Sequence, residues 1–170
     1  MTLMQIRLLL TALCLSAGSV PSVAAEATDS TGQPVVILFD RSYSMNEPLN
    51  GQPKIEIAKA AFRELAQRLH DQTRVAVRFF AGGVNKQDNA ANCRASERSF
   101  AMGHRVDAAT MEKLVAGLRP LGRKTNIAYA IEQATQELAG LQGGRIILIS
   151  DGQENCDLDP ITLAADLAQK

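Results

Sequence analysis

The sequence lacks tryptophan, and aromatic residues make up only 4% of its 170 residues. A hydrophobic core must therefore be built mainly from aliphatic side chains. An excess of charge of one sign is also missing, because 18 basic residues balance 18 acidic residues. No run of lysine and arginine stands out, and no aromatic residues alternate with basic ones. The chain thus has no electrostatic footprint of a nucleic-acid-binding protein, and we expect no nucleic-acid partner.

The first 25 residues have the pattern of a secretory signal peptide. Arg7 precedes an apolar run over residues 8–20, and a Val-Ala-Ala sequence ends at Ala25. We expect cleavage after Ala25 and a periplasmic or secreted protein. The apolar run is shorter than the roughly 20 residues that span a bilayer. A retained membrane anchor is therefore the weaker alternative, and lipid attachment at Cys14 is weaker still because a leucine precedes it.

The expected mature chain, residues 26–170, is long enough for one domain with a sizeable core. Losing the single basic residue of the signal peptide leaves 17 basic and 18 acidic residues, a net charge of about −1. Residues 26–34 are small and polar and are predicted to form a linker. Residues 35–170 are predicted to form the domain.

Cys93 and Cys156 are the two cysteines of the predicted mature chain. An exported protein meets an oxidising compartment, so the pair favours a disulfide. On the chain-entropy model, closing a loop of this length stabilises the folded state by roughly 4 kcal/mol. Two unpaired buried thiols are the alternative, because the sequence does not show whether the two α-carbons lie close together.

Apolar runs rich in β-branched residues predict the strands. Residues 35–39 and 145–150 have the pattern of strands with both faces covered, as in a parallel sheet between helices. Residues 74–81 predict a third strand, and residues 99–102 a short edge strand. The polar stretch 84–98 is predicted to be a long loop.

Amphipathic segments between the strands predict helices near residues 53–69, 107–118 and 126–141, and a last helix that begins after Asp159. In the first helix, apolar residues recur at helical spacing. The charged residues expected to face mostly outward there are Lys54, Glu56, Lys59, Arg63 and Glu64. Buried strands that alternate with helices predict an α/β fold, a doubly wound, mostly parallel sheet with helices on both faces.

Polar side chains follow both buried strands. Asp40, Ser42 and Ser44 follow the first strand, Asp151 follows the last, and Thr125 stands at the start of a predicted helix. Ligands of doubly wound sheets bind outside the carboxyl ends of the strands, so we expect these five side chains to converge. Two carboxylates and three hydroxyls form an all-oxygen set, which suits Mg²⁺ (or Mn²⁺ or Ca²⁺) and not Zn²⁺.

The charge of this set predicts how the cation would act. Two carboxylates at most neutralise a divalent ion, so the ion keeps an open coordination position for an anionic oxygen. We therefore expect a protein partner that presents an aspartate or glutamate to the metal. No catalytic residues are predicted, and the chain is expected not to be an enzyme.

The ordered motifs Asp-x-Ser-x-Ser, Gly-x-x-Thr-Asn and Ser-Asp-Gly resemble the metal-ion-dependent adhesion site of von Willebrand factor type A domains, in particular bacterial secreted members. The resemblance implies a Rossmann-like fold. It also implies that Ser42 and Ser44 bind the metal directly, that Asp40 and Asp151 bind it directly or through water, and that Thr125 changes its distance between states.

Two features depart from the family pattern. Tyr43 stands where the family commonly has glycine, which implies a stiffer or partly covered loop. The family's sheet usually has six strands, and no segment after residue 150 resembles the last two, so the domain is expected to be incomplete at its C-terminus. Residues 145–150 would then form an exposed edge, open to self-association.

Two other functions remain as alternatives. A magnesium-dependent phosphatase of the haloacid dehalogenase type needs a second carboxylate two residues after its aspartate, and Ser42 stands there. A purely structural domain with an empty metal site is the other alternative. Among nearby residues, Arg41, Arg123 and Lys124 are expected to be solvated surface charges, with the steering of an acidic partner as the alternative. Glu154 and Asp157 are expected to lie at the rim of the site.

Overall fold

The computed structural model describes residues 33–69, 73–103 and 107–168. Its main sheet has the strand order β5-β4-β1-β6. The strands are β1 (Val35–Asp40), β4 (Val75–Phe80), β5 (Ser96–Gly103) and β6 (Arg145–Ile149). β1 pairs in parallel with both β4 and β6, whereas β5 pairs antiparallel with β4 at one edge. The mostly parallel sheet confirms the predicted fold class.

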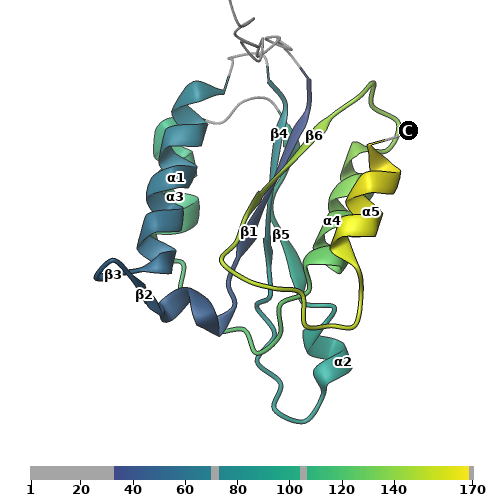
Figure 1. Cartoon of the computed structure of the whole chain (residues 1–170). Coiled ribbons are helices and arrows are strands. Elements are labelled where there is room, and N and C mark those ends of the chain that lie inside the picture. The colour runs from purple at the N-terminus through teal and green to yellow at the C-terminus, as the bar shows by residue number, and fades with distance from the viewer. Residues whose placement is uncertain (1–32, 70–72, 104–106, 169–170) are drawn as a thin grey trace, which may run out of the picture.

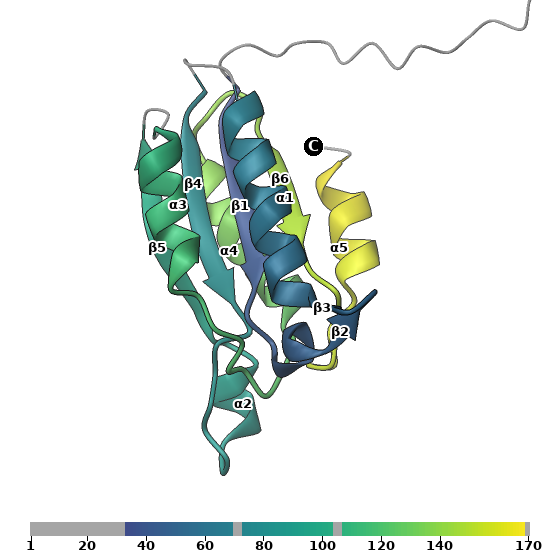
Figure 2. The ribbon, with the colours of Figure 1, turned by 90° about the vertical axis from the view of Figure 1, so that its left-hand side faces the viewer.

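Helices cover both faces of the sheet (Figure 1). One face carries α1 (Lys54–Arg68) and α3 (Ala108–Ala116), and the other carries α4 (Ile127–Leu138) and α5 (Pro160–Leu167). Figure 2 shows α1 and α3 next to each other in front of the sheet. Shorter elements complete the order: η1 (Tyr43–Asn46), β2 (Pro48–Leu49), β3 (Gln52–Pro53) and α2 (Asn89–Asn92).

The central strand β1 is buried along its whole length. Successive side chains of a strand point to opposite faces, so β1 supplies two separate cores. Ile37 and Phe39 pack towards α1 and α3 with Phe62. Val36 and Leu38 belong to the core under α4, where the helix contributes small residues such as Ala130 and Ala134. This central position fixes where the carboxyl end of β1 lies.

Three local predictions were wrong. The predicted loop 84–98 contains the short helix α2 and the first residues of β5. β6 was expected to be covered on both faces, but Leu148 is 42% exposed, because β6 has β1 on one side only and α5 buries no residue fully. Lys59 was expected to face solvent, yet it is buried and its ammonium bonds Glu56.

A buried ion pair joins the sheet to α4. Arg78 of β4 donates from its Nε to Glu137 Oε1 at 2.9 Å, and Arg98 of β5 donates to the same oxygen at 3.0 Å. The side chains of Arg78 and Glu137 are only 7% and 2% exposed. Neither residue belongs to the apolar pattern of its element, so the sequence alone did not indicate this contact.

The predicted signal peptide and nearly all of the predicted linker lie outside the described residues. Within the described ranges, no helix is both long and apolar enough to cross a membrane. The outer side of β6 pairs with no other described strand. Self-association along this edge stays a prediction.

Candidate metal centre

The candidate site lies where β1 and β6 end. Asp40 is the last residue of β1, and Ser42 and Ser44 follow at the start of η1. Asp151 follows β6 by two residues. Because β1 and β6 are parallel neighbours, their carboxyl ends meet at the same edge of the sheet. The predicted convergence of these four residues is therefore present in the geometry.

Short contacts connect the hydroxyls and carboxylates. The Oγ atoms of Ser42 and Ser44 lie 3.0 Å apart, and Ser44 Oγ donates to Asp151 Oδ1 at 3.0 Å. The Ser42 amide donates to Asp40 Oδ1 at 2.6 Å, which folds the chain back over the end of β1. Ser150 Oγ donates to Asp40 Oδ2 at 2.5 Å. The side chains thus form one connected oxygen cluster.

Thr125 borders the same cluster. It is 5% exposed and precedes α4. A methyl group on Gly152 would lie 3.3 Å from Thr125 Cγ2 and 3.7 Å from Asp40 Oδ2, so Thr125 and Asp40 flank Gly152. Asn155 holds the threonine backbone from both sides: the Thr125 amide donates to Asn155 Oδ1 at 2.7 Å, and the Asn155 amide donates to the Thr125 carbonyl at 3.0 Å.

Asp40 is the most deeply buried member of the cluster, with no exposed surface. Burial raises the pKa of this carboxyl, since the charged form loses its hydration. Hydrogen bonds from Ser150 and Ser42 oppose that rise by favouring the charged form, and nearby Asp151 adds to it. No ion pair to Asp40 occurs among the described residues. A bound cation would supply the missing opposite charge, so this donor set fits a hard metal ion.

The cluster does not resemble a site built from histidine or cysteine. Within the part of the chain that the structure describes, no three histidine, cysteine, aspartate or glutamate residues gather to hold a metal. A cation here would therefore depend on serine and threonine hydroxyls, which leaves it electrophilic.

Lys54 is an unexpected member of the site. Its ammonium lies 2.7 Å from Asp151 Oδ2 and 2.8 Å from Glu47 Oε2, and these hydrogen bonds raise its pKa. The Asp151 residue is exposed mainly through its backbone, because its side chain is only 11% exposed. Lys54 was expected to face solvent from α1, but its position as the first residue of that helix brings it to the end of β6 instead.

Glu154 and Asn155 accept hydrogen bonds from backbone amides near the site. Glu154 Oε2 accepts from the Ala128 amide in the first turn of α4, and its Oε1 accepts from the Cys156 amide. A carboxylate at a helix N-terminus satisfies unpaired amides and opposes the helix dipole. Glu154 was expected only to lie at the rim, so its anchoring role was missed, as was that of Asn155.

The disulfide between Cys93 and Cys156 is present, with α-carbons 5.5 Å apart. It confirms the favoured pairing. The bond joins the segment after α2 to the segment after β6, next to Asn155. The loop that positions Thr125 is therefore covalently tied to the loop that leads into β5.

Comparisons with known proteins agree with this geometry. The family model described as the von Willebrand factor type A domain matches residues 35–153. The uncharacterized protein YwmD of Bacillus subtilis (strain 168) is 32% identical over 145 residues, which cover 82% of this chain and 63% of that protein. The chain thus spans less than two thirds of this relative.

Solved structures share the fold. An aerotolerance-related membrane protein from Bacteroides fragilis superposes with a TM-score of 0.63 at 20% identity, over 81% of this chain and 63% of that one. The von Willebrand domain of the type V pili tip protein Mfa5 from Porphyromonas gingivalis gives 0.54 at 19% identity, over 73% and 39%. Domains of this kind are generally protein-interaction modules. By its matched residues, its relatives and its fold, the chain belongs to the von Willebrand factor type A family.

Proposed function

We propose that the oxygen cluster at the ends of β1 and β6 binds one divalent cation, Mg²⁺ or Mn²⁺ or Ca²⁺, and that the cation binds an aspartate or glutamate of a partner protein. The single observation that carries this proposal is the connected set of Asp40, Ser42, Ser44 and Asp151, with Thr125 on its border. The carboxylates would hold the cation, and the neutral hydroxyls would leave it able to accept one more anionic oxygen.

The proposal treats the chain as a binding module rather than as a catalyst. Phosphoryl-transfer chemistry of the phosphatase type would need an acid beside Asp40, and the residue two positions on is Ser42, whose hydroxyl contacts Ser44. The neighbouring cation, Lys54, is held by two carboxylates and is not poised as a base.

We also propose that the protein acts outside the cytoplasm, after removal of residues 1–25. The Cys93–Cys156 bond supports an oxidising compartment, because structural disulfides are rare in reducing ones.

The first test removes one proposed ligand. Ser42→Ala should weaken Mg²⁺ binding by a factor of about 10 to 100 or more. Even replacing a residue that only hydrogen-bonds to a metal ligand weakens metal binding by roughly this factor. Isothermal titration with Mg²⁺ and Mn²⁺ measures it. Ser99→Ala is the matched control, because the Ser99 hydroxyl is buried on β5 without a hydrogen-bond partner among the described residues.

The same two variants then serve in a pull-down from cell-envelope extract, with and without EDTA. Wild type and Ser99→Ala should retain partners in Mg²⁺ and lose them in EDTA, whereas Ser42→Ala should retain none. If the same partners are retained equally by all variants with and without EDTA, the proposed metal bridge is wrong. Mg²⁺-dependent turnover of p-nitrophenyl phosphate, lost in Ser42→Ala, would favour the phosphatase alternative.

A second prediction concerns Lys54, whose ammonium group lies beside Asp151. Lys54→Gln should tighten Mg²⁺ binding about tenfold, because the Lys54 ammonium bonds Asp151 Oδ2 and would repel a divalent ion held by the same carboxylate. Lys113→Gln, an exposed lysine on α3, should leave the affinity unchanged. Weaker binding by Lys54→Gln would show instead that Lys54 orients Asp151 for the metal.

A further inference from the structure

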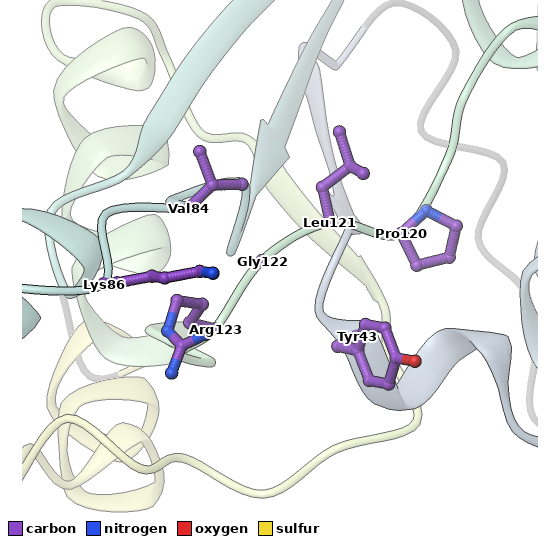
Figure 3. Close-up of a pocket in the computed structure, with 7 residues that line it drawn as sticks. All are labelled: Tyr43, Val84, Lys86, Pro120, Leu121, Gly122 and Arg123. Carbon is purple, nitrogen blue, oxygen red and sulfur yellow. The ribbon is translucent and has the colours of Figure 1, made fainter.

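A pocket of about 510 Å³ lies beside the candidate metal centre (Figure 3). We call it the side pocket. It is formed by the start of η1, the loop after β4 and the loop before α4. Its lining residues are Tyr43, Val84, Lys86, Pro120, Leu121, Gly122 and Arg123. None of these residues is one of the proposed metal ligands.

The side pocket gathers apolar side chains that solvent can reach. Tyr43 is 70% exposed, Val84 57% and Leu121 51%. In the described part of the chain, these are three of the eight large hydrophobic residues with high exposure. Scattered exposed apolar residues are ordinary, but several that line one pocket mark a binding surface.

The same backbone builds the side pocket and the metal centre. Tyr43 stands between Ser42 and Ser44, and its amide donates to the Gly122 carbonyl at 2.8 Å. The amides of Leu121 and Gly122 both donate to the Arg41 carbonyl at 3.0 Å. The side pocket is therefore held at a fixed place next to the cluster by main-chain hydrogen bonds.

Gly122 makes this close packing possible. A side-chain carbon at this position would lie 1.2 Å from the Ala81 carbonyl oxygen, so only glycine lets the loop before α4 rest on the end of β4. This contact sets the position of the backbone that carries Leu121 and Arg123.

The charge of the side pocket is positive. Lys86 and Arg123 lie next to each other along its border in Figure 3, away from Tyr43. Neither forms an ion pair with any residue in the described ranges. Two cations beside an apolar surface suit an acidic partner segment, because complementary charge selects the partner and speeds the encounter.

We propose that the side pocket binds a bulky apolar side chain of the same partner segment whose carboxylate binds the metal, while Lys86 and Arg123 bind a second acidic group of that segment. This inference rests on the proposed function, since it takes the partner's first carboxylate to be at the cation. It adds what the metal alone cannot supply, which is selection among the many acidic surfaces that a protein meets.

The test uses an immobilised library of blocked heptapeptides with aspartate fixed at the centre and all flanking positions random, probed with the full mature chain in Mg²⁺. Retained peptides should be enriched in leucine, isoleucine or phenylalanine, and in a second aspartate or glutamate, near the central aspartate. Replacing the central aspartate by asparagine should abolish retention.

Variants separate the two parts of the proposal. For a retained peptide, Leu121→Ser should weaken binding about tenfold and remove the apolar preference, whereas Leu148→Ser, at a leucine of β6 that is also exposed, should not. Lys86→Glu should remove the preference for the second acid, whereas Lys113→Glu should not. Mg²⁺ affinity should stay the same in Leu121→Ser, Leu148→Ser and Lys113→Glu, and it should not fall in Lys86→Glu, because that change removes a positive charge beside the metal centre.

Other outcomes would contradict either the side pocket or the metal bridge. Retention that needs the central aspartate and Mg²⁺, but shows no apolar preference, would overturn the side pocket and leave the metal bridge standing. A library with no retained peptide would overturn both. A wild-type dimer in sedimentation equilibrium that Leu121→Ser converts to a monomer would assign the pocket to a second copy of this chain instead.

Discussion

Replacing Cys93 and Cys156 together by alanine is expected to lower the free energy of unfolding by roughly 4 kcal/mol. The two cysteines are 63 positions apart, so their bond removes much of the freedom of a long loop in the unfolded chain. The folded state should change little, since the bond lies between surface loops rather than in either core. Urea denaturation followed by circular dichroism measures the loss.

Wild type kept in a reducing agent is the matched control, because it should show the same loss without any substitution. A loss well below 1 kcal/mol in both samples would contradict the prediction. The double variant should also bind Mg²⁺ more weakly, because Asn155 holds the Thr125 backbone next to the bond. If Mg²⁺ affinity is unchanged, Asn155 positions Thr125 without help from the disulfide.

Glu137→Ala is expected to destabilise the fold by about 3–5 kcal/mol, the range for removing one partner of a buried ion pair. The variant would leave the guanidinium of Arg78, a side chain that is only 7% exposed in the wild-type structure, without its carboxylate, although Ser96 Oγ would still accept one of its hydrogen bonds. Thermal and urea unfolding measure the change. Glu132→Ala, an exposed glutamate on the same helix, should change stability by no more than about 0.5 kcal/mol.

A double replacement distinguishes the charge from the packing. Arg78→Met with Glu137→Leu removes both charges, and such replacements of buried pairs are often neutral or stabilising. We expect this variant to recover most of the stability that Glu137→Ala loses. If it is as unstable as the single variant, the contribution of the pair lies in its shape and in the hydrogen bonds of Arg98 and Ser96.

The strands and helices could be predicted because their patterns are local. The apolar run of β1 and the helical spacing of Ile55, Ala58 and Phe62 each follow from which side chains must leave water. The convergence of Asp40 and Asp151 could be predicted because parallel neighbouring strands bring their carboxyl ends together. The disulfide was favoured on a different ground, the oxidising compartment expected for an exported protein. The exposure of β6 was misjudged because an apolar run alone does not tell how many of its sides are covered.

The contacts of Lys54 and Arg78 were missed because they join residues far apart in the sequence. Lys54 and Asp151 are 97 positions apart, and Arg78 and Glu137 are 59 apart. A charged residue on a helix usually faces solvent, and nothing in its neighbours shows that a distant carboxylate lies beside it. Ser150 could have been found, because it directly precedes Asp151 at the end of a strand, where its hydroxyl can reach the neighbouring strand end.

The side of β6 that faces away from β1 pairs with no other described strand and points along the plane of the sheet, whereas the oxygen cluster lies beyond the ends of the strands. A second polypeptide laid parallel beside β6 would lengthen the sheet sideways and would leave the cluster uncovered. Self-association along this edge and the proposed binding of a partner at the cluster would therefore use different surfaces of the molecule.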